Sequence, residues 1–130
     1  MYLNCHSYYS LRYGTFSEVA LLELAVANNV DTLALTDINN TSACMNFIQQ
    51  AKKHHIQPVV GVDFRNGNAQ QFVALAKSNI GFENINRYLS SFLESKTPIP
   101  DTPSYLEDVC IIYPFEKVLE LHLTSFAEHE

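Results

Sequence analysis

The sequence has few basic residues for its length. Its 130 residues include eight Lys and Arg against fourteen Asp and Glu, so the formal net charge is −6 at pH 7. Binding to a nucleic-acid backbone depends on clustered Lys and Arg, because these side chains displace the counterions of the phosphates. The chain alone is therefore a poor candidate for nucleic-acid binding.

Cysteines are also few, and there is no long apolar run. Cys5, Cys44 and Cys110 lie far apart and form no CxxC pair, which predicts free thiols in a reducing compartment rather than a disulfide framework. The amino terminus lacks the basic start and apolar stretch of a signal peptide. No run of about 18 apolar residues exists to span a bilayer. We expect a soluble cytoplasmic domain with no membrane partner.

Several common catalytic signatures are missing as well. The chain contains no P-loop, no GxGxxG motif and no Ser-His-Asp order, so nucleotide binding and hydrolysis of those types have no support. The composition, 47% hydrophobic and 17% charged, is that of an ordinary globular protein. A chain of this length favours a single domain.

Strand-like and helix-like segments alternate along the chain. The apolar periodicity predicts strands at residues 2–6, 32–36, 58–64, 71–76 and 109–113, and helices from the Thr15 cap to about residue 27, at 42–54, at 81–94 and from 115. Thr15 and Glu18 fit a capping box, and Ser42 is suited to cap the second helix. This order favours parallel crossovers and an α/β layered or barrel-like domain. We place the α/β core at residues 1–95, followed in the same domain by a Pro-rich connection, a strand and a C-terminal helix at 96–130.

Polar clusters follow the first three predicted strands. They comprise residues 4–7, residues 36–40 and Asp63. In parallel α/β folds, ligands gather at the carboxyl ends of the strands. A multinuclear metal hydrolase would need such an arrangement, because its His and carboxylate ligands converge from several strands on ions that activate water. The number of suitable ligands here is small.

Three ordered segments carry a family resemblance: NCHSYYSLRYG at residues 4–14, ALTDINN at 34–40 and IQPVVGVD at 56–63. They resemble the PHP (polymerase and histidinol phosphatase) domain, in the form that opens the alpha subunit of bacterial DNA polymerase III. Residues 72–77, 80–85 and 87–90 continue the similarity in the same order. The resemblance covers about residues 2–95 and implies a PHP-type partial or abbreviated (β/α) barrel with mostly parallel strands.

The resemblance also implies where metal ligands would lie. Active members place His-x-His after the first strand, an acid before the glycine of the next loop, a His after Thr-Asp and a Glu after the Gly of the third motif. The matching positions here are Asn4, His6, Tyr13, Ile38 and Asp63. Three of the five are lost, His6 is kept, and Asp63 is one methylene shorter than Glu. The resemblance therefore implies a vestigial metal site at His6 and Asp63. We expect no catalytic residue and no cofactor beyond a divalent ion (zinc, manganese or magnesium) at that site.

Structural roles compete with metal binding at these residues. His6 fits a structural histidine bonded to neighbouring backbone or to Asp37, and Asp37 fits a cap of its loop and of the helix begun at Ser42. Asp63 fits an ordinary acid at a strand end. His54 and His55 fall near a helix carboxyl end, where a positive charge is favoured.

Two further groups of side chains allow other roles. His122 and His129 are seven residues apart and could share one helix face. Tyr8, Tyr9 and Tyr13 could stack on bases, whereas in an acidic domain packing of the loop against the barrel is the simpler role.

Three functions follow. The first is a structural PHP domain of a replicative DNA polymerase, with the polymerase body of the same chain and a proofreading exonuclease as partners and DNA contacted only through the whole protein. The second is an active metal-dependent phosphoesterase or 3′-5′ exonuclease that recruits Asn4, Cys5 or His122. The third is a stand-alone binding module, which predicts a reading frame that ends near Glu130.

Overall fold

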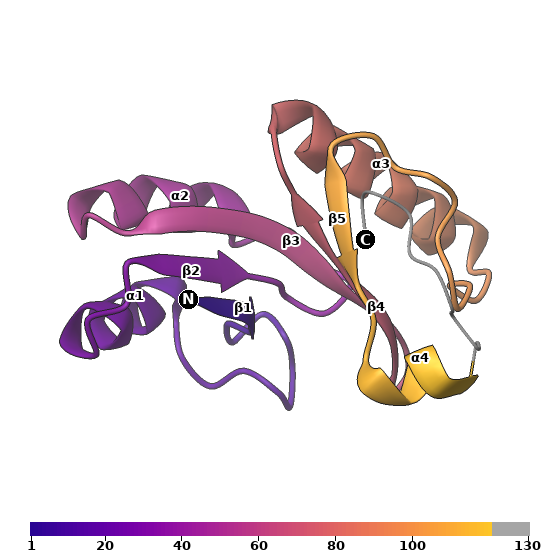
Figure 1. Cartoon of the computed structure of the whole chain (residues 1–130), viewed down its shortest axis with the longest axis horizontal. Coiled ribbons are helices and arrows are strands. Elements are labelled where there is room, and N and C mark those ends of the chain that lie inside the picture. The colour runs from indigo at the N-terminus through magenta and orange to yellow at the C-terminus, as the bar shows by residue number, and fades with distance from the viewer. Residues whose placement is uncertain (121–130) are drawn as a thin grey trace.

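A computed structural model of the chain describes residues 1–120 and contains five strands and four helices in that range (Figure 1). The predicted pair His122 and His129 lies outside the described residues. In chain order the elements are β1 (Tyr2–Cys5), α1 (Glu18–Ala27), β2 (Thr32–Leu35), α2 (Cys44–Lys53), β3 (Gln57–Asn66), β4 (Ala69–Ala76), α3 (Asn79–Ser95), β5 (Val109–Ile112) and α4 (Phe115–Glu120).

The five strands form one sheet in the order β1-β2-β3-β4-β5. The α/β class is confirmed, with parallel pairing from β1 to β3 and antiparallel pairing of β4 with β3 and with β5. The change of direction follows from the connection: β3 and β4 are joined by Gly67 and Asn68, and a loop this short can join only antiparallel strands. Gly67 has a φ of +59°, a conformation that suits glycine in such a turn.

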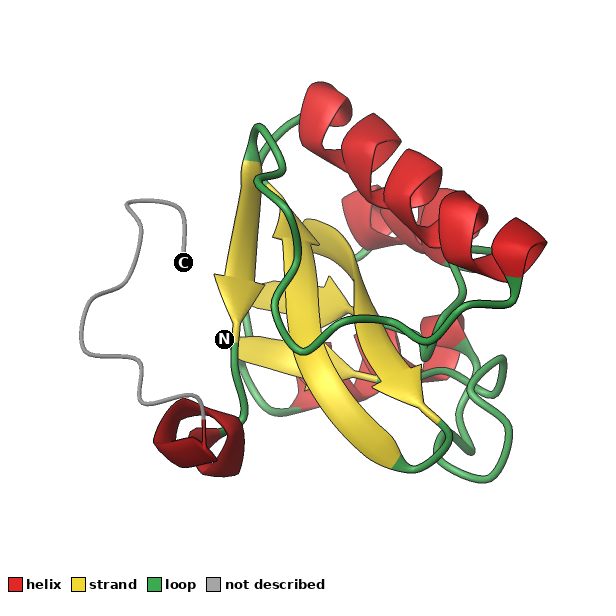
Figure 2. Ribbon diagram, turned by 90° about the vertical axis from the view of Figure 1, so that its right-hand side faces the viewer, coloured by secondary structure: helices red, strands yellow, loops and turns green. Residues whose placement is uncertain are grey.

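The long strand β3 links two halves of the molecule, one containing β1, β2, α1 and α2 and the other β4, β5 and α3 (Figures 1 and 2). Its alternate side chains Val60, Val62 and Phe64 are buried among residues of α1, α2 and α3. Successive side chains of a strand point to opposite faces, so Val59 and Asp63 belong to the other face. That face also carries Ala34, Val73 and Leu75. We call it the open face, because none of α1–α3 packs on it.

The helix starts differ from the predicted caps. Helix α1 is capped by Ser17, whose Oγ accepts from the backbone N–H of Ala20 at 3.1 Å, and not by Thr15. Helix α2 begins at Cys44 without a side-chain cap, because its N-cap residue is Ala43, which has no side-chain oxygen; the backbone N–H of Ser42 donates to Asn40 Oδ1 in the turn before the helix. Ser42 therefore lies ahead of the helix.

Residues 96–108 run as an extended connection that returns the chain to the sheet (Figure 2). The side-chain amide of Asn66 binds the backbone of this connection through two hydrogen bonds, as a neighbouring strand would. It donates to Ile99 O at 2.7 Å and accepts from Ile99 N at 2.9 Å. After the connection, β5 pairs with β4, and its Val109 and Ile111 side chains are buried in the hydrophobic core between the sheet and α3. The boundary at residue 95 stays a prediction. Among residues 1–120, no helix is long and apolar enough to cross a membrane.

Candidate functional site

The polar centre of the open face is Asp63, a fully buried carboxylate in the interior of β3. Four donors surround it. Its Oδ2 accepts from His6 Nε2 at 3.0 Å and from Nε and Nη2 of Arg65 at 3.0 and 2.8 Å. Its Oδ1 accepts from Gln70 Nε2 at 2.9 Å. A carboxylate offers about four lone-pair sites, and the donors equal that number, with three on Oδ2 and one on Oδ1.

A β-bulge brings Gln70 into this group. Arg65 lies two residues after Asp63 on the same strand and therefore on the same face. The register of β3 and β4 shifts between Phe64 and Arg65, so that Phe64 pairs with Phe72 while Arg65 pairs with Gln70. The extra residue in β4 moves Gln70 to the face of Asp63, which re-aims a side chain as bulges commonly do.

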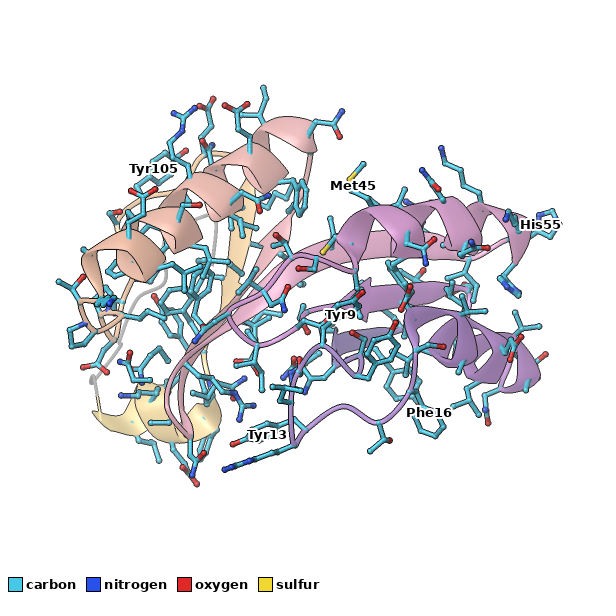
Figure 3. The ribbon with its side chains drawn as sticks, turned by 180° about the vertical axis from the view of Figure 1, so that it is seen from behind. Tyr9, Tyr13, Phe16, Met45, His55 and Tyr105 are labelled. Carbon is cyan, nitrogen blue, oxygen red and sulfur yellow. The ribbon has the colours of Figure 1, made fainter. Side chains whose placement is uncertain are left out.

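Tyr13 closes the cluster from the loop between β1 and α1 (Figure 3). The guanidinium carbon of Arg65 lies 4.7 Å from the centre of the Tyr13 ring, within the range of a cation–π contact. The ring meets His6 edge-on with centroids 6.4 Å apart, and its hydroxyl lies 3.1 Å from Asn68 Oδ1 in the hairpin turn. The loop is thereby attached to the β3–β4 hairpin.

The charges of this cluster are mutually stabilised. Burial by itself raises the pKa of Asp63, but hydrogen bonds from His6, Arg65 and Gln70 and the charge of Arg65 outweigh it and lower the pKa below its usual value. The hydrogen bond to Asp63 is the main reason why the pKa of Arg65 is raised. Asp63 is therefore an anion and Arg65 a cation at neutral pH.

A second buried carboxylate, Asp37, organises the loop that follows β1. It accepts from the backbone N–H of Ser7 at 2.7 Å and from the hydroxyls of Ser7 and Ser10 at 2.6 Å each. Ser10 Oγ in turn accepts from the backbone N–H of Ile38 at 2.9 Å. All three polar side chains are nearly or fully buried. Asp37 thus fixes residues 7–10 against the end of β2.

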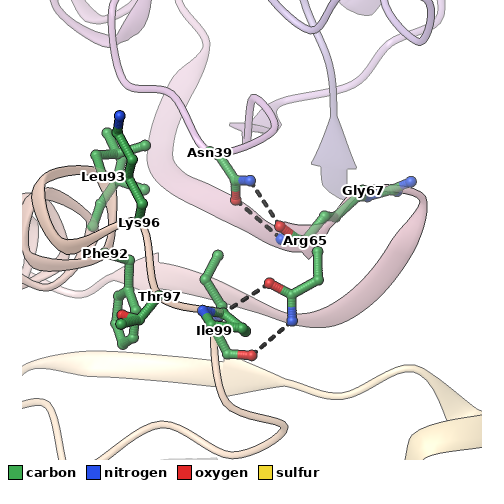
Figure 4. A pocket seen from close by; sticks show the side chains of 11 residues that line it. Asn39, Arg65, Gly67, Phe92, Leu93, Lys96, Thr97 and Ile99 are labelled. Carbon is green, nitrogen blue, oxygen red and sulfur yellow. Dashed lines mark hydrogen bonds between the residues drawn. The ribbon is translucent and has the colours of Figure 1, made fainter.

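Two pockets adjoin the cluster. One, of about 450 Å³, is lined by Arg65, Asn68 and Gln70 together with Glu116 and Lys117, so its charged groups carry both signs. The other, of about 410 Å³, lies between the backbone of Arg65 and Asn66 and the end of α3 (Figure 4). The charged residues that line this second pocket, Arg65 and Lys96, are both basic.

Comparison with known proteins identifies the family to which the chain belongs. The profile of the PHP domain matches residues 3–126. The chain belongs to the PHP domain family. It is 37% identical over 94 residues to the DNA polymerase III subunit alpha of Ureaplasma parvum, covering 72% of this chain and 10% of that protein. It is 32% identical over 127 residues to the same subunit of Bacillus subtilis, covering 90% of this chain and 11% of that protein. The PHP domain described here thus matches about a tenth of the length of these curated relatives.

Solved structures share the fold. A protein from Bifidobacterium adolescentis described as a metal-dependent phosphoesterase superposes with a TM-score of 0.54 and 16% identity, over 69% of this chain and 32% of that one. An amidohydrolase from Chromobacterium violaceum, with bound sulfate and no metal, superposes with a TM-score of 0.56 and 24% identity, over 72% of this chain and 33% of that one. These likenesses confirm the PHP-type fold.

The structure brings together most of the five positions at which the family resemblance predicted metal ligands. His6 contacts Asp63 directly, Tyr13 stacks beneath Arg65, and Ile38 forms an isolated bridge with Asp63. Asn4 is engaged separately, because its Oδ1 accepts from the Thr36 hydroxyl at 2.7 Å.

Several predicted roles need correction. His6 bonds to Asp63 rather than to Asp37, and Asp63 lies inside a strand rather than at its end, because β3 continues to Asn66. Asp37 caps the 7–10 loop but not α2. The predicted place of His54 and His55 near a helix carboxyl end is confirmed, because His54 is the C-cap residue of α2 and His55 lies at the far end of that helix from Tyr13 (Figure 3).

Arg65 and Gln70 are the residues that the sequence did not point to. Arg65 follows Asp63 by two residues, the spacing of a shared strand face, but it lies one residue beyond the predicted strand at 58–64. Gln70 had no such signal, because its orientation depends on the bulge.

The donor set does not fit a divalent ion. Within residues 1–120, no group of three or more His, Cys, Asp or Glu side chains is placed to hold a metal. Oδ2 of Asp63, the oxygen that faces His6, already accepts three hydrogen bonds. Catalytic sites ordinarily supply three protein ligands to each metal, and here one of the three groups nearest to Asp63 is a guanidinium, which is itself a cation.

Proposed function

We propose that this chain serves as the PHP module of a bacterial DNA polymerase III alpha subunit, in a structural rather than a hydrolytic role. The relatives named above carry that name, and the matched segment is about a tenth of their length. DNA synthesis would then belong to the remainder of such a subunit. The acidic charge of −6 suits a module that does not itself hold DNA.

The observation that carries the structural role is the saturated carboxylate. Asp63 and His6 are the two retained positions of the family site, and we propose that they are its vestige. His6 Nε2 and both carboxylate oxygens of Asp63 are used for each other and for Arg65 and Gln70. A metal ion would have to displace the partly buried guanidinium of Arg65 before it could reach Oδ2.

The surface of α1 supports packing against the rest of a longer polypeptide. Helix α1 is apolar on most of its circumference, and Leu24 and Val26 are exposed by 45% and 48%. A helix that is apolar all round is typical of a buried position. Beside it, β1 is an edge strand with one neighbour, and an apolar groove of about 300 Å³ separates the two. We propose that this groove and edge receive the polymerase body. No described feature selects a surface for a proofreading exonuclease.

Metal analysis and a hydrolysis assay test the proposal together. The protein is purified without chelator, its zinc, manganese and iron are quantified, and hydrolysis of bis(p-nitrophenyl) phosphate is followed with added Mn²⁺. We expect metal well below one ion per chain and the same rate for wild type and His6→Ala. One ion per chain, with hydrolysis that His6→Ala abolishes, would instead establish the metal-dependent phosphoesterase.

A further inference from the structure

The Arg65 side chain is placed as an internal counterion. Its guanidinium donates two hydrogen bonds to the Oδ2 atom of Asp63 that also faces His6. The Asp63 side chain is fully buried and that of Arg65 is 13% exposed. A buried carboxylate without a nearby positive charge is strongly unfavourable, and in the described chain Arg65 is the cation that this carboxylate contacts.

The backbone around Arg65 is fixed independently of that ion pair. The Asn39 amide donates to Arg65 O at 2.8 Å and accepts from Arg65 N at 3.0 Å (Figure 4). The same strand region holds the bulge that aims Gln70 at Asp63. On the far side of the guanidinium, the Tyr13 ring provides a flat support. The guanidinium is therefore held in place from the backbone, from Asp63 and from the ring.

We propose that Arg65 takes over the electrostatic role of a metal ion in this PHP domain: its guanidinium neutralises Asp63 and joins β3, the end of β1 and the loop bearing Tyr13. A divalent ion between His6 and Asp63 would supply positive charge and bring these segments together. The guanidinium does both with one charge and fixed geometry, since it is planar and does not lose its proton. The inference depends on the proposal that the site holds no metal.

A double-mutant cycle of Arg65→Met and Asp63→Asn tests this role, with urea denaturation as the measurement. Arg65→Met keeps an apolar stem but leaves Asp63 without its counterion, so we expect the unfolding equilibrium constant to rise by about a hundredfold or more. Asp63→Asn removes the buried charge. In the double variant we therefore expect a constant at least about tenfold smaller than in Arg65→Met alone.

Arg87→Met is the matched control, because the Arg87 pair with Glu83 is exposed and follows helical i,i+4 spacing. Exposed pairs contribute little, so its unfolding constant should change by no more than about threefold. If Arg65→Met fails to fold, Arg65→Lys replaces it: Lys keeps the charge without the planar fork, and Asp63→Asn should then give it no rescue.

The outcomes separate this inference from the proposed function. The counterion role would be overturned if the double variant were as unstable as Arg65→Met, or if Arg65→Met raised the unfolding constant no more than Arg87→Met does. Neither result would change the metal analysis. One tightly bound metal per wild-type chain would overturn the proposed function first.

Discussion

Replacing Asp37 by Ala should cost this small domain a large part of its stability. The carboxylate is 1% exposed and accepts three hydrogen bonds from Ser7 and Ser10. The two hydroxyls can turn toward other acceptors, whereas the backbone N–H of Ser7 is fixed and would remain buried without a partner. A buried unsatisfied donor costs about 1–3 kcal/mol. Adding a smaller loss for the hydroxyls gives an expected destabilisation of about 3 kcal/mol, against a total of about 5–15 kcal/mol for a typical domain.

Urea denaturation followed by far-ultraviolet circular dichroism measures this loss. Asp31→Ala is the matched control, because Asp31 is exposed and a substitution there should stay within about 0.5 kcal/mol. Asp37→Asn should fall between the two, since the amide keeps one acceptor oxygen but no charge. If Asp37→Ala were no less stable than Asp31→Ala, the reasoning from unsatisfied buried donors would be refuted.

Three further predictions concern the titration of the cluster, a helix cap and a close backbone approach. Because the pKa of Asp63 is lowered in the folded state, the unfolded chain protonates this carboxylate first as the pH falls. The stability that Asp63 contributes should therefore be fully present above about pH 5 and be lost as the pH falls below it. Asp63→Asn should make the urea midpoint depend less on pH between about pH 3 and 6. Ser17→Ala should cost about 1 kcal/mol in the same assay through loss of the α1 cap, while Thr15→Ala should be close to neutral. Gly61→Ala should be strongly destabilising, because a Cβ there would lie 2.0 Å from the carbonyl oxygen of Ala74. A melting temperature equal to that of the wild type would contradict this close approach.

The order of strands and helices could be predicted from the sequence because each element carries its own periodicity. The apolar alternation of β3 and the spacing on α2 and α3 are local signals, and the structure contains these elements within a few residues of the expected limits. The start of α1 was misplaced because Thr15 and Ser17 are both good caps, and only the path of the loop decides between them.

The candidate site was only partly predictable. His6 and Asp63 do lie in contact, but the partner of His6 was not predictable, since Asp37 and Asp63 are both remote from it in sequence and only the alignment of the strands decides between them. Arg65 and Gln70 reach Asp63 through a strand that is longer than predicted and through a bulge in its neighbour. Both depend on cross-strand register, which a single sequence does not reveal.

The most direct test of the central claim is a Mn²⁺ titration followed by ¹H–¹⁵N spectra of the 130-residue chain. Paramagnetic broadening marks residues close to a bound ion. If the guanidinium of Arg65 stands in for a metal, substoichiometric Mn²⁺ should leave the amides of His6, Asp63 and Arg65 as sharp as the amide of Phe47, a core residue of α2 outside the cluster. Selective broadening of these three amides at low Mn²⁺, with Phe47 unaffected, would contradict the account.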